Sequence, residues 1–131
     1  MLALVIDDSR TMRRIVARSL TDVGYDVMEA GDGQEALDIL NGGALPELAC
    51  VDWNMPVMDG LTFVNRVREN PAWRDITLMM VTTESEHSQI VRALAAGAHE
   101  YLIKAFTPQA MVEKLELLGL VPESGETEEL S

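Results

Sequence analysis

Short apolar runs alternate along the chain with segments whose apolar residues recur at helical spacing. The runs are rich in Val, Ile, Leu, Met and Tyr, and they occupy residues 2–6, 25–30, 48–51, 77–81 and 101–103. Continuous apolar runs of this length are typical of strands that are covered on both faces of a sheet. We therefore predict five buried strands.

The segments between these runs predict helices. The first has an apolar stripe followed by Gly24, a common residue at a helix end; the stripe is Met12, Ile15, Val16, Ser19, Leu20 and Val23. Asp32 with Glu35 resembles a capping box at the start of the second helix. Asp59 can cap a third helix, whose inner face is Phe63, Val64 and Val67 and which ends before Pro71.

Two further helices follow in the second half of the chain. Residues 84–96 predict a fourth helix with Val91, Leu94 and Ala95 facing inward. Thr107 followed by Pro108 is a strong start signal for a fifth, because the hydroxyl can cap the helix and proline suits its first position. Strands alternating with helices predict an α/β fold, a doubly wound parallel sheet with helices on both faces. The periodicity does not give the strand order.

Composition sets broad limits on the protein. Its 131 residues suit a single domain, which we place at residues 1–121, followed by an acidic and flexible tail at residues 122–131. The apolar runs are too short to span a membrane and no signal peptide is recognised, so we expect a cytoplasmic protein. Cys50 has no partner for an internal disulfide. The net charge of −12 argues against direct binding of nucleic acid.

Polar side chains follow four of the predicted strands where each strand ends. Asp7 and Asp8 follow the first, Asp52 the third, Thr82 the fourth and Lys104 the fifth. Functional groups of open parallel sheets collect at the carboxyl ends of the strands. We therefore expect these side chains to meet at one edge of the sheet.

The residue types indicate the chemistry of that edge. Asp7, Asp8 and Asp52 would repel one another unless they are neutralised, and an all-oxygen cluster suits Mg²⁺. A carboxylate beside such a metal can act as the nucleophile towards a phosphoryl group and form an acyl phosphate. Lys104 and the Thr82 hydroxyl are placed to stabilise the phosphoryl oxygens.

Four motifs together resemble a known family: VIDDSRTMRRIV, VDWNMPVMDG, VTTE and EYLIKAF. The sequence, over about residues 2–120, is similar to the receiver domains of bacterial two-component response regulators, of the single-domain chemotaxis (CheY-like) type. The resemblance implies a flavodoxin-like (βα)5 fold with strand order 2-1-3-4-5.

The resemblance also implies residue roles. Asp52 matches the phosphorylated aspartate, and Asp8 and Asp7 match metal-binding carboxylates, the second of them through water. Asn54 matches the position whose backbone carbonyl completes the metal site. Thr82 matches the switch hydroxyl and Lys104 the phosphate-contacting lysine. A further match is the aromatic switch residue, Tyr101.

The implied activity is that of a monomeric signalling switch rather than an enzyme. A histidine kinase donates the phosphoryl group in a Mg²⁺-dependent reaction, and slow self-catalysed hydrolysis removes it at a rate that Asn54 and Glu84 tune. When the phosphorylated Asp52 draws Thr82 inward, Tyr101 can turn into the space that opens. The implied target is a flagellar switch protein, and the expected partner surface is Ile90, Tyr101, Ile103 and Met111, although each position also suits a core.

Three positions depart from the family pattern. Ala105 replaces the proline that usually follows the lysine with a cis peptide bond. Because a non-proline cis bond costs about 2.5–4 kcal/mol, we expect Lys104–Ala105 to be trans or heterogeneous. Thr83 is bulkier than usual and is expected to narrow access to the phosphoryl group. His87 replaces a frequent lysine on the chemotaxis output face and weakens the inference of a flagellar partner.

Other functions remain open at this stage. A phosphorelay intermediate, or a regulator of another signalling enzyme, fits the same residues. A haloacid-dehalogenase-like phosphohydrolase is less favoured, because its nucleophile and acid are two residues apart whereas Asp7 and Asp8 are adjacent. A flavodoxin-like electron carrier would need a first loop that cradles phosphate, and no such loop rich in Ser, Thr and Gly is seen.

Overall fold

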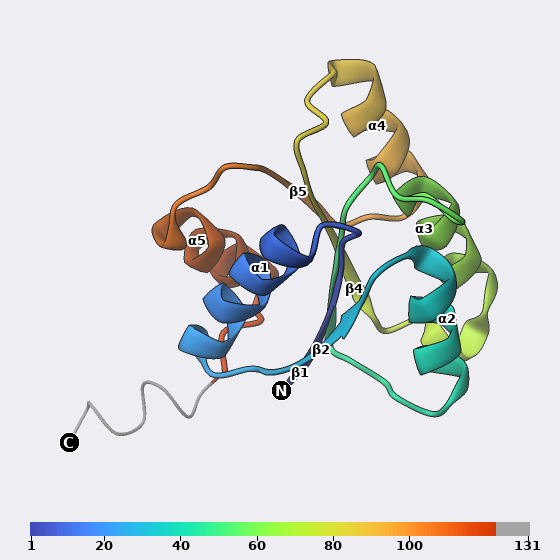
Figure 1. Ribbon diagram of the computed structural model, residues 1–131, viewed down its shortest axis with the longest axis horizontal. Coiled ribbons are helices and arrows are strands. Elements are labelled where there is room, and N and C mark those ends of the chain that lie inside the picture. Colours follow the sequence, from blue (N-terminus) through green and yellow to red (C-terminus); the bar gives the residue numbers. More distant parts are fainter. Residues whose placement is uncertain (123–131) are drawn as a thin grey trace.

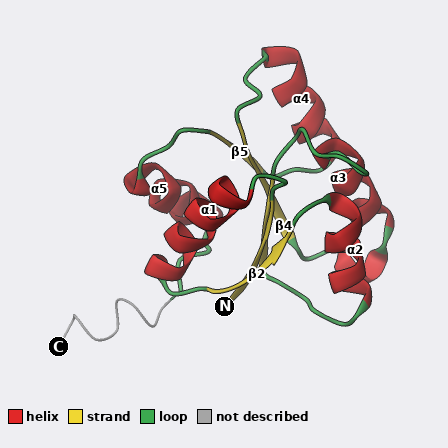
Figure 2. Cartoon of the chain, in the orientation of Figure 1, coloured by secondary structure: helices red, strands yellow, loops and turns green. Residues whose placement is uncertain are grey.

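The computed structural model describes residues 1–122 and consists of a sheet between two layers of helices (Figure 1, Figure 2). The strands are β1 (Leu2–Ile6), β2 (Asp26–Ala30), β3 (Leu48–Val51), β4 (Thr77–Thr82) and β5 (Glu100–Ile103). The helices are α1 (Arg10–Val23), α2 (Gly33–Asn41), α3 (Gly60–Glu69), α4 (His87–Ala96) and α5 (Pro108–Leu118), with a short 3-10 helix at Pro71–Trp73.

The sheet is parallel throughout, with the strands in the order β2-β1-β3-β4-β5. Helices α1 and α5 cover one face, and α2, α3 and α4 cover the other (Figure 1). The doubly wound, flavodoxin-like fold and its strand order are therefore confirmed. Each predicted strand lies within one residue of its observed bounds.

The core follows this layering. One cluster of buried side chains lies between the sheet and α2, α3 and α4, and it includes Phe63, Val64 and Val67 as predicted. A second cluster lies between the sheet and the α1–α5 layer and includes Val16, Leu20 and Met111. Strand residues alternate between the two clusters because successive side chains of a strand point to opposite faces.

The predicted helix ends are confirmed by hydrogen bonds. The Asp32 side chain accepts from the Glu35 N–H at 2.8 Å, and the Asp59 side chain accepts from Thr62 N–H at 2.8 Å. The Thr107 hydroxyl accepts from Ala110 N–H at 3.1 Å. Gly24 ends α1 with φ of 120°, in the left-handed region that glycine tolerates best.

The predicted start of α4 and some of the residues predicted to face the core from α4 and α1 are wrong. Helix α4 begins at His87 rather than at residue 84, and Val91, Leu94 and Ala95 are exposed, whereas Ala93 is its buried residue. Ala93 is the only fully buried residue of α4, and Gln89, Ile90 and Ala96 are half-buried, so an apolar residue on this helix need not face the core. Ile15 on α1 is also 48% exposed.

The predicted acidic tail lies almost wholly outside the described residues, since Pro122 is the last of them. Within residues 1–122, no helix combines the length and the apolar character that crossing a bilayer requires.

Candidate functional site

The carboxyl ends of β1, β3, β4 and β5 bring the predicted site residues together. Asp52 N–H donates to the carbonyl of Ile6 at 2.9 Å, which continues the β1–β3 pairing by one residue and sets Asp52 beside Asp7. Lys104 N–H donates to the Thr82 carbonyl at 2.9 Å and extends the β4–β5 pairing in the same way. The positions at this edge thus follow from the register of the sheet.

The three carboxylates form a compact cluster. Asp7, Asp8 and Asp52 each offer an oxygen, and these atoms all lie within 4.8 Å of one another. Asp7 and Asp52 are buried, at 2% and 8% exposure, while Asp8 is exposed at the rim. An all-oxygen donor set with one solvent-facing side fits a hard divalent cation that keeps part of its water shell.

Lys104 provides the positive charge of the site. Its ammonium nitrogen lies 2.5 Å from Asp7 Oδ2 and 3.6 Å from Asp52 Oδ2. The lysine side chain is 5% exposed, so these ion pairs are shielded from bulk water. One ammonium between two buried carboxylates leaves net negative charge at this edge, which favours a further cation.

Asp52 is held in a fixed orientation. Its Oδ1 accepts from the N–H of Trp53 at 2.8 Å. Burial raises the pKa of this carboxyl above its usual value, while the Thr82 hydroxyl and Lys104 oppose the rise. The carboxylate is thus poorly hydrated yet oriented by neighbours, as suits a nucleophile.

Thr82 and Tyr101 connect the site to α4. The Thr82 hydroxyl is fully buried and accepts from the N–H groups of Trp53 and Glu84, each at 3.3 Å. The Tyr101 ring is 7% exposed, and its hydroxyl donates to the Glu84 carbonyl at 2.7 Å. In this structure the tyrosine already lies in the inward position and is tied to the segment that precedes α4.

Gly60 is a residue of the site that the sequence did not single out. A Cβ built on it would lie 2.2 Å from the Asp52 carbonyl oxygen, and its N–H donates to the Trp53 carbonyl at 2.8 Å. The start of α3 therefore packs directly against the backbone of Asp52. The sequence signal that could have indicated Gly60 is its position directly after the capping Asp59, in the motif MDG.

Comparisons with known proteins agree with this geometry. Residues 3–116 match the model of the response regulator receiver domain. The chain belongs to the response regulator receiver family. It is 44% identical to the chemotaxis protein CheY1 of Helicobacter pylori over 119 residues, which are 90% of this chain and 96% of that protein. It is 46% identical to the CheY homolog of Campylobacter jejuni, over 88% of this chain and 90% of that one.

A solved structure of a similar protein has the same fold. The structure of the chemotaxis response regulator CheY4 of Vibrio cholerae has a TM-score of 0.80 and 36% sequence identity, and the match covers 88% of this chain and 95% of that one. The predicted resemblance to receiver domains is thereby confirmed.

The Lys104–Ala105 peptide of this receiver domain differs from the prediction. It is cis, so the expectation of a trans or heterogeneous bond is wrong. That expectation weighed the local preference of the peptide alone. The lysine before it is held at both its N–H and its ammonium, by Thr82 and Asp7, and these contacts across the sheet are not visible in the local sequence.

The residues expected to form the partner surface differ in their exposure, and the surface itself remains a prediction. Ile90 is half-buried and Ile103 is 37% exposed, but Met111 is fully buried against the sheet, so its assignment to that surface is wrong. Met111 lies on the inner face of α5, where it packs in the core cluster. The exposed apolar residues that the sequence missed here are Val91 and Leu94 of α4.

The roles expected of Asn54 and Thr83 remain predictions. Both side chains are exposed in loops that follow the strands of the site.

Proposed function

We propose that this receiver domain is a single-domain response regulator that accepts a phosphoryl group on Asp52 from a histidine kinase. The observation that supports this most is the placement of buried Asp52 among Asp7, Asp8 and Lys104 at an open edge of the sheet. The similar proteins are named as chemotaxis proteins, which favours a role in chemotaxis with a flagellar switch protein as target. We expect this protein to act in the cytoplasm.

The residues would divide the chemistry as follows. The Asp52 carboxylate attacks phosphorus, an O–P bond forms, and the bond from phosphorus to the donor nitrogen breaks; the nitrogen keeps the electron pair and takes up a proton. Asp7, Asp8 and Asp52, with the Asn54 carbonyl, would hold Mg²⁺, whose charge offsets that of the carboxylates and the phosphoryl oxygens. Lys104 binds a phosphoryl oxygen and must loosen its hold on Asp7 to do so.

Switching would pass from Thr82 to Tyr101 and then to the α4–β5 surface. A phosphoryl group on Asp52 offers new acceptors to the Thr82 hydroxyl. The Thr82 hydroxyl now accepts the Glu84 N–H, and the Glu84 carbonyl accepts the Tyr101 hydroxyl. Movement of Thr82 therefore shifts the peptide that holds the tyrosine, next to the exposed Val91, Leu94 and Ile103. The protein acts by binding rather than by turnover of a substrate.

The test is intact mass after incubation with acetyl phosphate and Mg²⁺. We expect one phosphoryl adduct on the wild type, none on Asp52→Asn, and a normal adduct on the control Asp59→Asn, whose amide can still cap α3. An adduct on Asp52→Asn, or none on the wild type, would contradict the proposal. Hydrolytic turnover of a small phosphate ester would instead favour a phosphohydrolase.

A phosphorelay intermediate is the second candidate, because the same site serves both roles. Binding to a flagellar switch protein, measured with and without an acyl-phosphate mimic, separates them. A relay protein would pass its phosphoryl group to a histidine of a second protein and show no gain in binding.

A further inference from the structure

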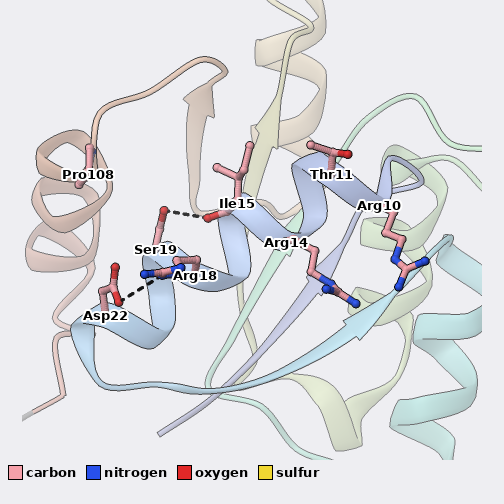
Figure 3. A pocket seen from close by; sticks show the side chains of 8 residues that line it. All are labelled: Arg10, Thr11, Arg14, Ile15, Arg18, Ser19, Asp22 and Pro108. Atoms are coloured by element: carbon pink, nitrogen blue, oxygen red, sulfur yellow. Dashed lines mark hydrogen bonds and ion pairs between the residues drawn. The ribbon is translucent and has the colours of Figure 1, made fainter.

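Three arginines form a stripe on the exposed side of α1. Arg10, Arg14 and Arg18 are spaced by four residues and so lie on one side of the helix. They line an open groove of about 700 Å³ (Figure 3), which we call the basic groove; its other lining residues are Thr11, Ile15, Ser19, Pro108 and one acidic residue, Asp22. The chain carries 10 basic and 22 acidic residues, so this concentration of positive charge opposes the overall balance.

Most of this charge has no counter-ion within residues 1–122. Arg18 pairs with Asp22 at 4.0 Å, with side chains 83% and 69% exposed (Figure 3), and an exposed pair of this kind contributes about 0–1 kcal/mol. Arg10 and Arg14 form no ion pair with any described residue. Ile15, which follows Arg14 and is 48% exposed, offers apolar contact in the same groove. The basic groove therefore suits an acidic peptide segment.

The described chain ends close to one end of this groove. The Tyr25 hydroxyl donates to the carbonyl of Leu120, which ties the residues after α5 to the residues after α1. Tyr25 follows Gly24, the C-terminal cap of α1. The chain thus leaves the folded body beside the C-terminal end of α1, the end nearer to Arg18.

The sequence that follows has the matching charge. Residues 123–131 contain Glu123, Glu126, Glu128 and Glu129 and no basic residue. Extended chain covers about 3.3–3.6 Å per residue, so this segment can reach about 30 Å. The helix rises about 1.5 Å per residue, so the stripe from Arg18 to Arg10 is about 12 Å long.

We propose that the acidic segment at residues 123–131 docks in the basic groove of the same molecule, running back along α1 with its glutamates against Arg18 and Arg14. Individual exposed ion pairs are weak, but a short tether holds the segment at an effective concentration in the millimolar range. The docked segment shields α1 from other acidic chains. This makes access to the helix dependent on ionic strength.

The test uses the full chain with a nitroxide spin label on Thr127→Cys. Cys50 is buried and burial raises the pKa of its thiol to about 12, so the label reacts at residue 127. We expect selective loss of amide NMR intensity for residues 10–22 and recovery of that intensity at high salt. This loss of amide NMR intensity should disappear in the double variant Arg14→Glu/Arg18→Glu. It should persist in the control Arg66→Glu, because Arg66 is an exposed arginine on α3.

A second variant guards against an indirect effect of the substitutions on α1. Glu126→Gln, Glu128→Gln and Glu129→Gln leave α1 unaltered and should also restore the intensity of residues 10–22. Uniform loss over the whole surface, or loss that survives both sets of variants, would overturn the proposal. The proposal would also be overturned if the spin-labelled protein reduced the amide NMR intensity of an isotope-labelled copy that carries no spin label. A segment of a second molecule would then occupy the groove.

Discussion

The hydroxyl of Tyr101 donates a 2.7 Å hydrogen bond to the backbone carbonyl of Glu84, and the ring is 7% exposed. The bond joins β5 to the loop that leads from β4 into α4. Burial is the main reason that the pKa of Tyr101 rises to about 12, with smaller contributions from Glu84 and Asp52. Tyr101 is thus neutral and faces inward in this structure.

Alkaline titration tests this arrangement. The chain has two tyrosines, and burial also raises the pKa of Tyr25 to about 12. The unfolded chain ionises its tyrosines near pH 10, so their contribution to stability is complete below about pH 10 and is lost as pH rises towards 12. We expect the absorbance change of tyrosinate to be absent at pH 10.5 in the folded protein. An absorbance change near pH 10 that corresponds to ionisation of one tyrosine would contradict this arrangement, because it would show that one ring is exposed to water.

The close approach of Gly60 to Asp52 gives a second prediction. Its Cβ position lies 2.2 Å from a backbone oxygen, so Gly60→Ala must displace either α3 or the Asp52 peptide. Overpacking of this kind costs about 1–3 kcal/mol, which denaturant unfolding would detect. We expect lower phosphoryl adduct yield as well.

Gly42→Ala is the matched control for that substitution. Gly42 has φ of −78°, and its Cβ position lies 3.4 Å from the nearest atom, so alanine fits. Equal destabilisation of the two variants would contradict the role given to Gly60.

Val57 carries backbone strain in the loop between β3 and α3. It is 81% exposed and has φ of 68°, a left-handed conformation that β-branched residues rarely adopt. Val57→Gly should raise the free energy of unfolding by about 1 kcal/mol, because that conformation costs a residue with a Cβ about 1–2 kcal/mol. In contrast, the exposed helical control Val91→Gly should lower it, because glycine is a poor helix former. Loss of stability in both variants would argue against strain at Val57.

The sequence allowed prediction of features that depend on local signals. Strands appeared as short apolar runs, and helix starts appeared as Asp32, Asp59 and Thr107 because a cap involves neighbouring residues. The convergence of Asp7, Asp52 and Lys104 followed from a rule of parallel sheets. The family resemblance supplied the strand order, which periodicity does not contain.

Features that depend on the packing of distant segments were not predictable. The burial of Met111 and the exposure of Val91 are set by how α5 and α4 lie against the sheet, and both segments have similar apolar content. The conformation of the Lys104–Ala105 peptide does not follow from the local sequence, and the contacts of Lys104 are made across the sheet. Likewise, the contact of Arg68 with His99 joins α3 to the loop before β5.

This contact lies at the edge of the sheet opposite to the site and gives the last prediction. His99 Nδ1 lies 3.2 Å from both Leu78 N and Arg68 Nη2, and it accepts the Leu78 N–H, so the ring must be neutral. Burial and then the charge of Arg68 lower the pKa of His99 below 6.5. The unfolded chain therefore binds the proton more readily, and stability declines as pH falls below about 6.5.

His99→Asn keeps an acceptor without a titrating ring, so it should reduce this decline in stability, measured by thermal unfolding between pH 7 and 5. The control His87→Asn, on exposed α4, should not reduce it. An unchanged pH profile in His99→Asn would exclude this histidine as the cause.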